Sequence, residues 1–305
     1  MRKLNKLSLG LLLCEGRFSC VKASKILGFS SHDQLTRQYA SEYTFGPVED
    51  WSTLPQSGLL VVDSSVIAKP FAQDIEGIGY TYSSLEDKVV LGLDMLLVLW
   101  VAQGTRYVLE VILPQGENGN VLFREVLIHV KEAGLKPEKV LFDSWFGATE
   151  TLNLIHASGW HYVCRVKSNR LLNNKPVKEH DFWGARGKTG RLRGVRHRVQ
   201  IVKHDERYLL TNDLSPHTSG DLARVYQKRW VIETVFRDLK QVLHLEKCQC
   251  RSLTAQFNHI LAALHAYRFL HEAFQGQSAE SAQQEFIASF RRGEINLHDF
   301  LAPAA

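Results

Sequence analysis

Two short apolar runs of this chain each end in an aspartate. The first runs from Leu59 to Asp63 and the second from Lys139 to Asp143. Short apolar runs of this kind are typical of strands that are buried on both faces, and such strands need helices to cover their sheet. A single aspartate at a strand end is most often a cap or a turn former. Two of them in one chain favour an α/β core and suggest a functional site, without establishing one.

The segments around these runs alternate between strand and helix patterns. Further strands are expected at residues 89–101, 107–113, 161–166, 198–203 and 208–212, with a hairpin turn at 103–106. Helices are expected at residues 20–29, 34–39, 120–133, 148–157, 221–243, 254–274 and 279–290, with Ser219 or Asp221 as the cap of the fifth. Strands that alternate with helices and are followed by helices alone predict a mixed α/β core with an inserted module.

The composition excludes several classes of protein. Apolar residues make up 45% and charged residues 23% of the chain, which is unlike a disordered, collagen-like or coiled-coil protein. The longest apolar run, Met95–Ala102, is far shorter than the roughly 20 residues that span a bilayer. Five scattered cysteines favour a reducing compartment. The leucine-rich segment before Cys14 imitates a signal peptide, but Leu13 is too bulky for a cleavage site, so we expect a cytoplasmic protein.

Positive charge is concentrated between residues 161 and 212. Thirteen Lys and Arg residues stand against four acids there, a net charge of +9, whereas the whole chain carries +5 and the remainder therefore −4. Such a stretch attracts a polyanion because each Lys or Arg at a phosphate releases condensed counterions. It predicts nucleic-acid binding; a solvated face on a basic protein is the alternative.

The expected helix of residues 221–243 carries one acid among cations. At 100° per residue, Tyr226, Arg229, Glu233, Arg237 and Lys240 fall within an 80° arc. Such an arrangement is typical of a metal-binding carboxylate beside phosphate-binding groups, since a solvated face more often alternates its charges. The adjacent sector is apolar and is expected to pack on the core: Val225, Ile232, Val235, Phe236, Leu239, Val242 and Leu243.

These residues carry a resemblance to a known family. The spacing of Tyr226, Arg229, Glu233 and Lys240 matches the Tyr-Arg-Glu-Lys signature of DDE transposases of the insertion sequence 4 family. The segment 62–65 resembles the family's first-aspartate motif, although the family more often has a second acid or a threonine there. The segment 143–147 resembles the second-aspartate motif, and the resemblance covers about residues 59–270 in the expected order.

The resemblance implies a fold, a metal site and DNA contacts. The fold is a ribonuclease-H-like mixed sheet flanked by helices, with an inserted β-rich domain and a helical N-terminal region. Asp63, Asp143 and Glu233 would be catalytic and would hold two Mg²⁺ or Mn²⁺ ions. The expected DNA-binding residues are Tyr226, Arg229, Arg237, Lys240, Arg191, Arg193, Arg196, Arg198 and Trp183. Trp183 is also the candidate to stack on a flipped base, although a core tryptophan is the alternative.

The same resemblance gives expected domain boundaries. They are a helical DNA-binding region at 1–52, the first part of the core at 53–160, the basic insertion at 161–220, the second part with the Glu233 helix at 221–275 and a helical tail at 276–305. In the first region, two helices joined at Gly28 are typical of a helix-turn-helix and equally of any pair of antiparallel helices.

The function expected from the resemblance is DNA transposition. The enzyme would cut at the terminal inverted repeats of an insertion sequence and join the 3′-OH ends to target DNA. Its partners would be DNA and a second copy of the chain in a paired-end complex, with no membrane, in the bacterial cytoplasm at the nucleoid. A catalytically idle or domesticated DNA-binding protein is the main alternative. A metal-dependent nuclease with the same core fold is another.

Overall fold

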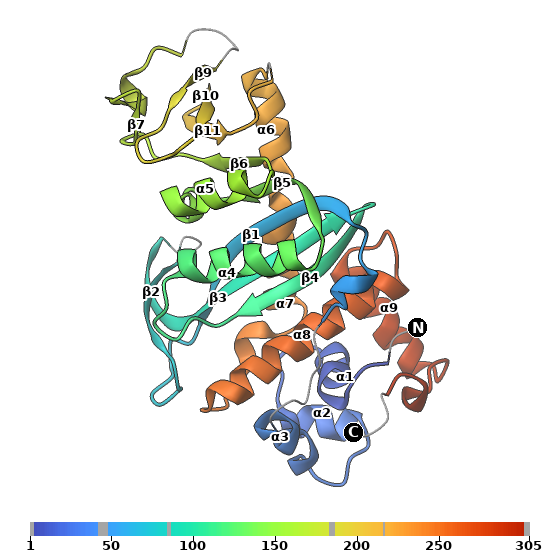
Figure 1. Cartoon of the computed structure of the whole chain (residues 1–305). Helices are drawn as coiled ribbons and strands as arrows, with labels where there is room; N and C mark the ends of the chain where they lie inside the picture. Colours follow the sequence, from blue (N-terminus) through green and yellow to red (C-terminus); the bar gives the residue numbers. More distant parts are fainter. Residues whose placement is uncertain (1–2, 42–47, 84–86, 183–186, 216, 302–305) are drawn as a thin grey trace. The chain divides into compact units, whose positions relative to one another are not determined.

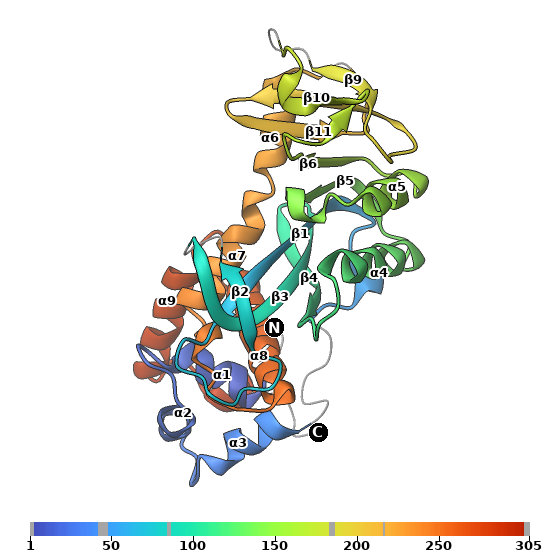
Figure 2. The ribbon, with the colours of Figure 1, turned by 90° about the vertical axis from the view of Figure 1, so that its left-hand side faces the viewer.

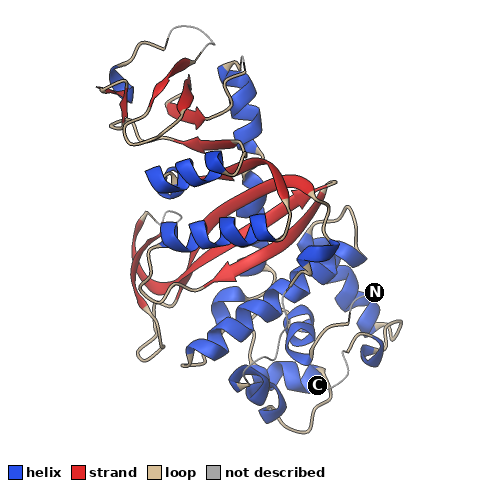
Figure 3. Ribbon diagram, in the orientation of Figure 1, coloured by secondary structure: helices blue, strands red, loops and turns tan. Residues whose placement is uncertain are grey.

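The computed structural model describes residues 3–41, 48–83, 87–182, 187–215 and 217–301 (Figure 1, with helices and strands coloured by type in Figure 3). Contacts between residues divide the chain into two units. The first unit comprises residues 1–48, 65–95 and 234–305, and the second comprises residues 49–64 and 96–233. Two long strands, β1 (Ser57–Ala68) and β3 (Lys88–Ala102), contribute residues to both units.

A mixed sheet forms the centre of the second unit. Its strands follow the order β4–β3–β1–β5–β6–β11–β10–β9. The remaining bounds are β4 (Thr105–Ile112), β5 (Lys136–Phe142), β6 (Tyr162–Arg165), β9 (Lys188–Arg191), β10 (Arg198–His204) and β11 (Arg207–Thr211). β5 pairs in parallel with β1 and with β6, whereas β3–β4 and the ladder β6–β11–β10–β9 are antiparallel. This order confirms the expected mixed sheet.

The strands of the basic insertion continue that sheet. β11 pairs with β6, and β10 and β9 follow outward. Only the short hairpin of β7 (Leu171–Leu172) and β8 (Lys175–Pro176), followed by the 3₁₀ helix η3 (Val177–Glu179), forms a separate sheet. Residues 162–165, which we expected at the start of the insertion, are a parallel strand of the central sheet.

Helices cover both faces of the sheet in the second unit. On one face lie α4 (Gly119–Glu132) and α5 (Thr149–Ala157), and on the other lies α6 (Ser219–Gln227), which contacts β6, β10 and β11 (Figure 2). The core beneath α4 and α5 is apolar and includes Phe123, Leu152 and Phe142. The 3₁₀ helices η1 (Trp51–Thr53) and η2 (Ser144–Phe146) complete this unit.

The first unit is mainly helical. Its elements are α1 (Lys6–Leu13), α2 (Cys20–Ile26), α3 (Asp33–Ala40), β2 (Gly79–Ser83), most of α7 (Trp230–Gln241), η4 (Leu245–Lys247), α8 (Leu253–Ala273), α9 (Ala279–Arg291) and η5 (Leu297–Asp299). β2 pairs with the N-terminal part of β3. α1 packs against α2, α8 and α9, and its leucines are buried all round, as in a core helix. No helix in the described ranges is both long and apolar enough to cross a membrane.

Most expected elements are confirmed to within two or three residues. The helices expected at 120–133, 148–157, 254–274 and 279–290 are α4, α5, α8 and α9. The hairpin at 103–106 is a two-residue turn in which Gln103 and Gly104 have φ of +52° and +77°, the conformation that a tight hairpin requires. The N-cap of α3 is His32, and the Ser31 hydroxyl before it accepts from the N–H of Asp33.

One expected helix is wrong. Residues 221–243 form two helices, α6 and α7, separated at Lys228 and Arg229. The cap of α6 is Thr218, one residue before the expected candidates. The Thr218 hydroxyl accepts from the N–H of Asp221 over 3.2 Å, and the Asp221 carboxylate accepts from the N–H of Thr218 over 2.9 Å. This reciprocal pair is a capping box, which satisfies two free N–H groups at once.

Candidate active site

The parallel pairing of β1 and β5 places Asp63 and Asp143 on adjacent strands. Val62 lies opposite Phe142 in the register, and each aspartate is the residue that follows. Asp143 lies just beyond the end of β5, as expected, but β1 continues to Ala68, so the expectation that Asp63 ends its strand is wrong. At Asp63, β1 instead extends beyond the last residue of β5 with which it pairs. The pairing brings together two carboxyl groups from positions 63 and 143.

The junction between α6 and α7 brings in the third carboxylate. The N–H of Arg229 donates to the carbonyl of Tyr226 over 2.9 Å, and the N–H of Ile232 donates to the carbonyl of Arg229 over 3.1 Å. These i→i+3 bonds wind the chain more tightly than an α-helix. At this junction Tyr226 contacts Asp143, and Arg229 contacts both Asp63 and Glu233. The arc expected from a continuous helix holds within α7 and does not extend across the junction to Tyr226.

Arg229 links two of the carboxylates directly. Its Nη1 lies 2.5 Å from Oδ2 of Asp63, and its Nη2 donates to Oε1 of Glu233. The third carboxylate has other partners. The Tyr226 hydroxyl donates to Oδ1 of Asp143 over 3.4 Å, and Nη1 of Arg165 lies 3.8 Å from the same oxygen. The Arg229 guanidinium lies 5.4 Å from the centre of the Tyr226 ring, and this contact joins the two groups into one network of two arginines and one tyrosine.

Burial decides the protonation of this network. Burial raises the pKa of Asp63 to about 6, although Arg229 and the N–H of Ser64 both lower it. Burial also raises the pKa of Tyr226, so its hydroxyl stays protonated and remains a donor. Burial opposes the charge of Arg229, but Asp63 in particular raises its pKa above the usual value. The guanidinium is therefore the counter-ion of the carboxylates.

The three carboxylates fit a divalent metal by their chemistry. Carboxylate oxygens are the ligands that Mg²⁺ prefers, and they come from three separate elements. In the described ranges, however, no three His, Cys, Asp or Glu side chains are already arranged around a metal position. The reason is local, since the Arg229 guanidinium lies between Asp63 and Glu233. Arg229 occupies Oδ2 of Asp63 and Oε1 of Glu233, and a metal ion between these residues would compete with it for those oxygens.

Arg229 also carries a sign of a missing acceptor. Its Nε is buried and has no hydrogen-bond partner among the residues that the structure describes. A buried charged donor without a partner is costly, so an acceptor such as a phosphate oxygen or water fits this position.

A small hollow beside Asp143 contains residues that the sequence did not single out. It has a volume of about 190 Å³, and its lining includes Trp145, Arg165, Lys167 and Arg170. The side chain of Trp145 is 64% exposed. The Arg170 guanidinium donates to the carbonyl of Gly147 over 2.6 Å and to the Thr149 hydroxyl over 3.3 Å, and has no carboxylate partner in the described part of the chain. Three cations and an exposed indole suit a phosphate with its base.

A signal for this hollow was present in the sequence. Arg165, Lys167 and Arg170 are three cations within six residues, at the end of the strand expected at 161–166 and directly after it. Because β6 pairs in parallel with β5, the end of β6 lies next to Asp143. These three cations lie near Asp143 because β6 is next to β5 in the sheet. The sequence alone does not give that strand order.

Two expected DNA-binding residues have other partners in the first unit. The Lys240 ammonium donates to the carbonyl of Val66 over 2.7 Å and lies 3.2 Å from the Glu246 carboxylate. Arg237 is 56% exposed, and its Nε lies 3.5 Å from Asp238. The contacts of both residues are thus within this unit. Their expected role in DNA binding stays a prediction.

The four arginines expected to bind DNA in the insertion are all exposed. Arg191, Arg193, Arg196 and Arg198 alternate with buried residues such as Leu192 and Val199. Arg191 lies directly opposite Arg198 on the antiparallel strands β9 and β10. Like charges directly opposite each other on paired strands repel, so an anion bound between Arg191 and Arg198 would reduce this repulsion. Trp183, the expected base-stacking residue, lies outside the described residues.

Comparisons with known proteins agree with this geometry. A family model described as "Transposase DDE domain" matches residues 55–269. No curated protein matches the chain. Among solved structures, the chain is similar to a piggyBac transposase in a synaptic complex with hairpin DNA, with 13% identity and a TM-score of 0.57 over 98% of this chain and 75% of that chain. A Drosophila P element transposase in a strand transfer complex gives 12% identity and a TM-score of only 0.28 over 94% of this chain and 64% of that one.

Proposed function

Because this chain belongs to the transposase DDE domain family, we propose that it cuts DNA at the terminal inverted repeats of an insertion sequence and joins the freed 3′-OH ends to target DNA. One observation carries the proposal. Asp63, Asp143 and Glu233, which are 80 and 90 residues apart in sequence, belong to one network around Arg229 and Tyr226. A structural ion pair with Arg229 needs only one of these acids, whereas three carboxylates together suit the oxygen ligands of two divalent ions.

The three carboxylates are proposed as the ligands of two Mg²⁺ or Mn²⁺ ions. When bound, such ions stabilise the entering and leaving oxygens of an in-line displacement and lower the pKa of a bound water. Asp63 and Asp143, from adjacent strands, would form the rigid half of the site, and Glu233 would supply the third ligand from α7. Tyr226 would keep the Asp143 carboxylate oriented through its 3.4 Å hydrogen bond.

Arg229 is proposed to exchange partners when DNA binds. Its guanidinium matches a phosphate as well as it matches a carboxylate, and its buried Nε is still without an acceptor. A backbone phosphate at this position would draw the guanidinium from Asp63 or Glu233 and free carboxylate oxygens for metal. Arg165, Lys167 and Arg170 would hold the next phosphate beside Asp143, and Trp145 would stack on a base there.

DNA and a second copy of the chain are the proposed partners. The solved relative with the higher TM-score is a synaptic complex with hairpin DNA, which supports DNA as the ligand of this fold. Pairing of two element ends needs two active sites, so we expect a homodimer on paired ends. The exposed arginines of the insertion are proposed to hold DNA phosphates, and the reaction is expected in the bacterial cytoplasm, where the nucleoid is accessible.

The test is a cleavage assay on a plasmid that carries the DNA flanking the coding region on both sides. The parent protein is expected to cut at inverted repeats in Mg²⁺ or Mn²⁺ and not in EDTA. Asp63→Asn and Glu233→Gln should abolish cutting and keep DNA binding, because an amide retains the shape of the side chain but loses the charge that holds the ions. Glu125→Gln on the exposed face of α4 is the matched control. A parent that binds but never cuts would identify an idle DNA-binding protein.

A further inference from the structure

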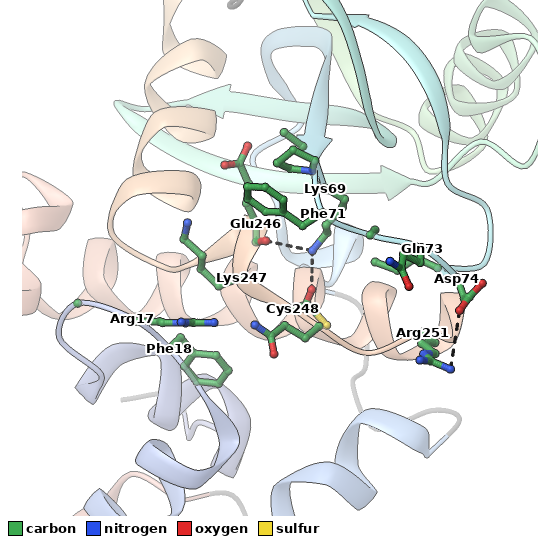
Figure 4. A pocket seen from close by; sticks show the side chains of 16 residues that line it. Arg17, Phe18, Lys69, Phe71, Gln73, Asp74, Glu246, Lys247, Cys248 and Arg251 are labelled. Atoms are coloured by element: carbon green, nitrogen blue, oxygen red, sulfur yellow. Dashed lines mark hydrogen bonds and ion pairs between the residues drawn. The ribbon is translucent and has the colours of Figure 1, made fainter.

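The first unit contains a large cavity that the proposed reaction does not use. Its volume is about 1030 Å³, and three segments line it: residues 16–18, 68–75 and 246–251 (Figure 4). All three segments belong to the same unit. A volume of this size is at the upper end for sites that enclose a small ligand, so it admits a few nucleotides of one strand and not a duplex.

The cavity carries an excess of positive charge. Arg17, Lys69, Lys247 and Arg251 stand against Asp74 and Glu246, a net charge of +2. Of the two acids, Glu246 is paired with Lys240 and Asp74 is 4.0 Å from Arg251. Figure 4 shows Arg17 and Lys247 at one side of the cavity and Arg251 with Asp74 at the other. In the described ranges, no carboxylate pairs with Arg17 or Lys247, so both are available to an anion.

A buried lysine adds to this field from within the wall. Lys69 is only 6% exposed, and its ammonium donates to the carbonyls of Cys248 over 2.7 Å and Glu246 over 3.1 Å (Figure 4). Burial lowers the pKa of Lys69. These bonds tie the start of the loop 69–78 to the segment 246–248. The Lys69 ammonium is thus bound by two backbone carbonyls, and Glu246 is the nearby carboxylate that favours its charge.

The loop that follows Lys69 presents an aromatic ring to solvent from fixed ends. Phe71 is 95% exposed. Five residues later the loop is held again, since the N–H of Glu76 donates to the carbonyl of Arg251 over 2.8 Å and its carboxylate accepts from the N–H of Leu253 over 2.9 Å. The Phe71 ring therefore lies on a loop that hydrogen bonds fix at both Lys69 and Glu76. An exposed aromatic among cations is typical of sites where bases stack and phosphates are neutralised.

We propose that this cavity binds an unpaired segment of DNA, with one base stacked on Phe71 and phosphates held by Arg17 and Lys247. The proposal rests on the proposed function for the choice of DNA, and it adds a site outside the three carboxylates and the arginines of the insertion. Cutting at an element end produces strand ends that must be kept from rejoining. A cavity for a few unpaired nucleotides serves this purpose.

The experiment measures the affinity of the full-length protein for a labelled single strand of roughly ten nucleotides, by fluorescence anisotropy in EDTA. No strand is cut without a divalent ion, so the result is independent of catalysis. Phe71→Ala should weaken binding roughly five- to hundredfold, and Phe71→Tyr should restore it, since stacking needs only a ring. Tyr80→Ala, which removes an 82% exposed ring on β2 outside the cavity, is the matched control and should change nothing.

The cations are tested by salt dependence. Arg17→Ala with Lys247→Ala should reduce the slope of log K against log[salt] by about 0.7 for each phosphate of a single strand that is no longer neutralised. Lys131→Ala with Lys136→Ala is the charge-matched control from the second unit. A duplex of the same sequence should be insensitive to Phe71→Ala.

Two results would overturn the proposal. One is an unchanged single-strand affinity in both Phe71→Ala and the double variant. The other is an equal reduction in affinity for duplex and single strand, which would assign the cavity to paired DNA. Failure of the plasmid cleavage assay with intact single-strand binding would instead reject the proposed function and keep this site as a binding site for unpaired DNA.

Discussion

Arg229 Nη1 lies 2.5 Å from Asp63 Oδ2, although the two residues are 166 positions apart in sequence. The same guanidinium also holds Glu233. The side chains of Arg229 and Asp63 are only 13% and 19% exposed, so the ion pair is largely buried. Removing one partner of such a pair is destabilising because it leaves the other charge buried without a counter-ion. Arg229 is thus the counter-ion of both Asp63 and Glu233.

The first prediction concerns Arg229→Ala in EDTA. The substitution leaves Asp63 and Glu233 close together without their cation, so the free energy of unfolding should fall by about 2 kcal/mol. Added Mn²⁺ should raise the melting temperature more in the variant than in the parent, because the competitor for the carboxylates is gone. Thermal denaturation with and without Mn²⁺ measures both effects. Arg224→Ala, at a 77% exposed arginine on α6, is the control and should be nearly neutral. Equal Mn²⁺ responses in parent and variant would contradict this account.

The second prediction concerns the arginines of the insertion. Neutralising Arg191, Arg193, Arg196 and Arg198 together should weaken binding to any duplex and reduce the slope of log K against log[salt] by about 0.9 for each duplex phosphate that is no longer neutralised. Sequence preference should change little, because phosphate contacts position a protein and base contacts specify its site. Titrations at several salt concentrations test this. An unchanged slope would make the +9 stretch a solvated face.

The third prediction concerns pH. Burial, together with the nearby His156, lowers the pKa of His197 to about 4 from an ordinary 6.5. Its ring stacks on His156 at 3.9 Å and bonds the Tyr162 hydroxyl at 3.0 Å. The unfolded chain takes up this proton below pH 6.5 and the folded chain only near pH 4, so stability is complete above 6.5 and falls as the pH drops through this window.

His197→Gln should therefore reduce the difference between the urea midpoints at pH 7 and pH 5. His161→Gln, at an exposed histidine, is the control and should leave the difference unchanged. Part of the dependence should persist in both variants, because burial also lowers the pKa of His259, to about 3. The assignment to His197 fails if its variant retains the full difference between the two midpoints.

The fourth prediction concerns the close approach of β1 and β3. A Cβ at Gly92 would lie 2.6 Å from the carbonyl oxygen of Ile67, so Gly92→Ala should cost about 1–3 kcal/mol of unfolding free energy. The matched control is its cross-strand partner Gly79, where a Cβ meets nothing within 4 Å. Urea denaturation of the two alanine variants gives the comparison. Equal midpoints would show that the strands can separate at no cost.

Much of the fold was predictable from local patterns. The runs before Asp63 and Asp143 are strands, and the helices around them have nearly the expected bounds. Apolar periodicity and turn residues act within a few positions, so they are visible in the sequence. The convergence of the three carboxylates was expected only from the family resemblance. Their assignment as metal ligands stays a prediction.

The break between α6 and α7 was not predictable in this way. Lys228 and Arg229 are good helix formers, so nothing local interrupts the pattern there. The break accompanies the contact of Arg229 with Asp63, a partner from a distant part of the sequence. The hollow beside Asp143 was missed for a related reason, since Arg165 and Lys167 become its lining only through the pairing of β5 with β6.

The pairing of β6 with β11 has an evolutionary consequence. Cys164 lies opposite Leu210, so the chain leaves the central sheet and returns to it at the same place. Insertions and deletions in the loops between β6 and β10 can accumulate without moving Asp143 or the strands on which α6 packs. A single residue inserted between Tyr226 and Glu233 would instead rotate the glutamate by about 100° away from the aspartates. Among proteins that descend from a common ancestor, the loops between β6 and β10 should therefore vary in length. The number of residues from Tyr226 to Glu233 should stay constant.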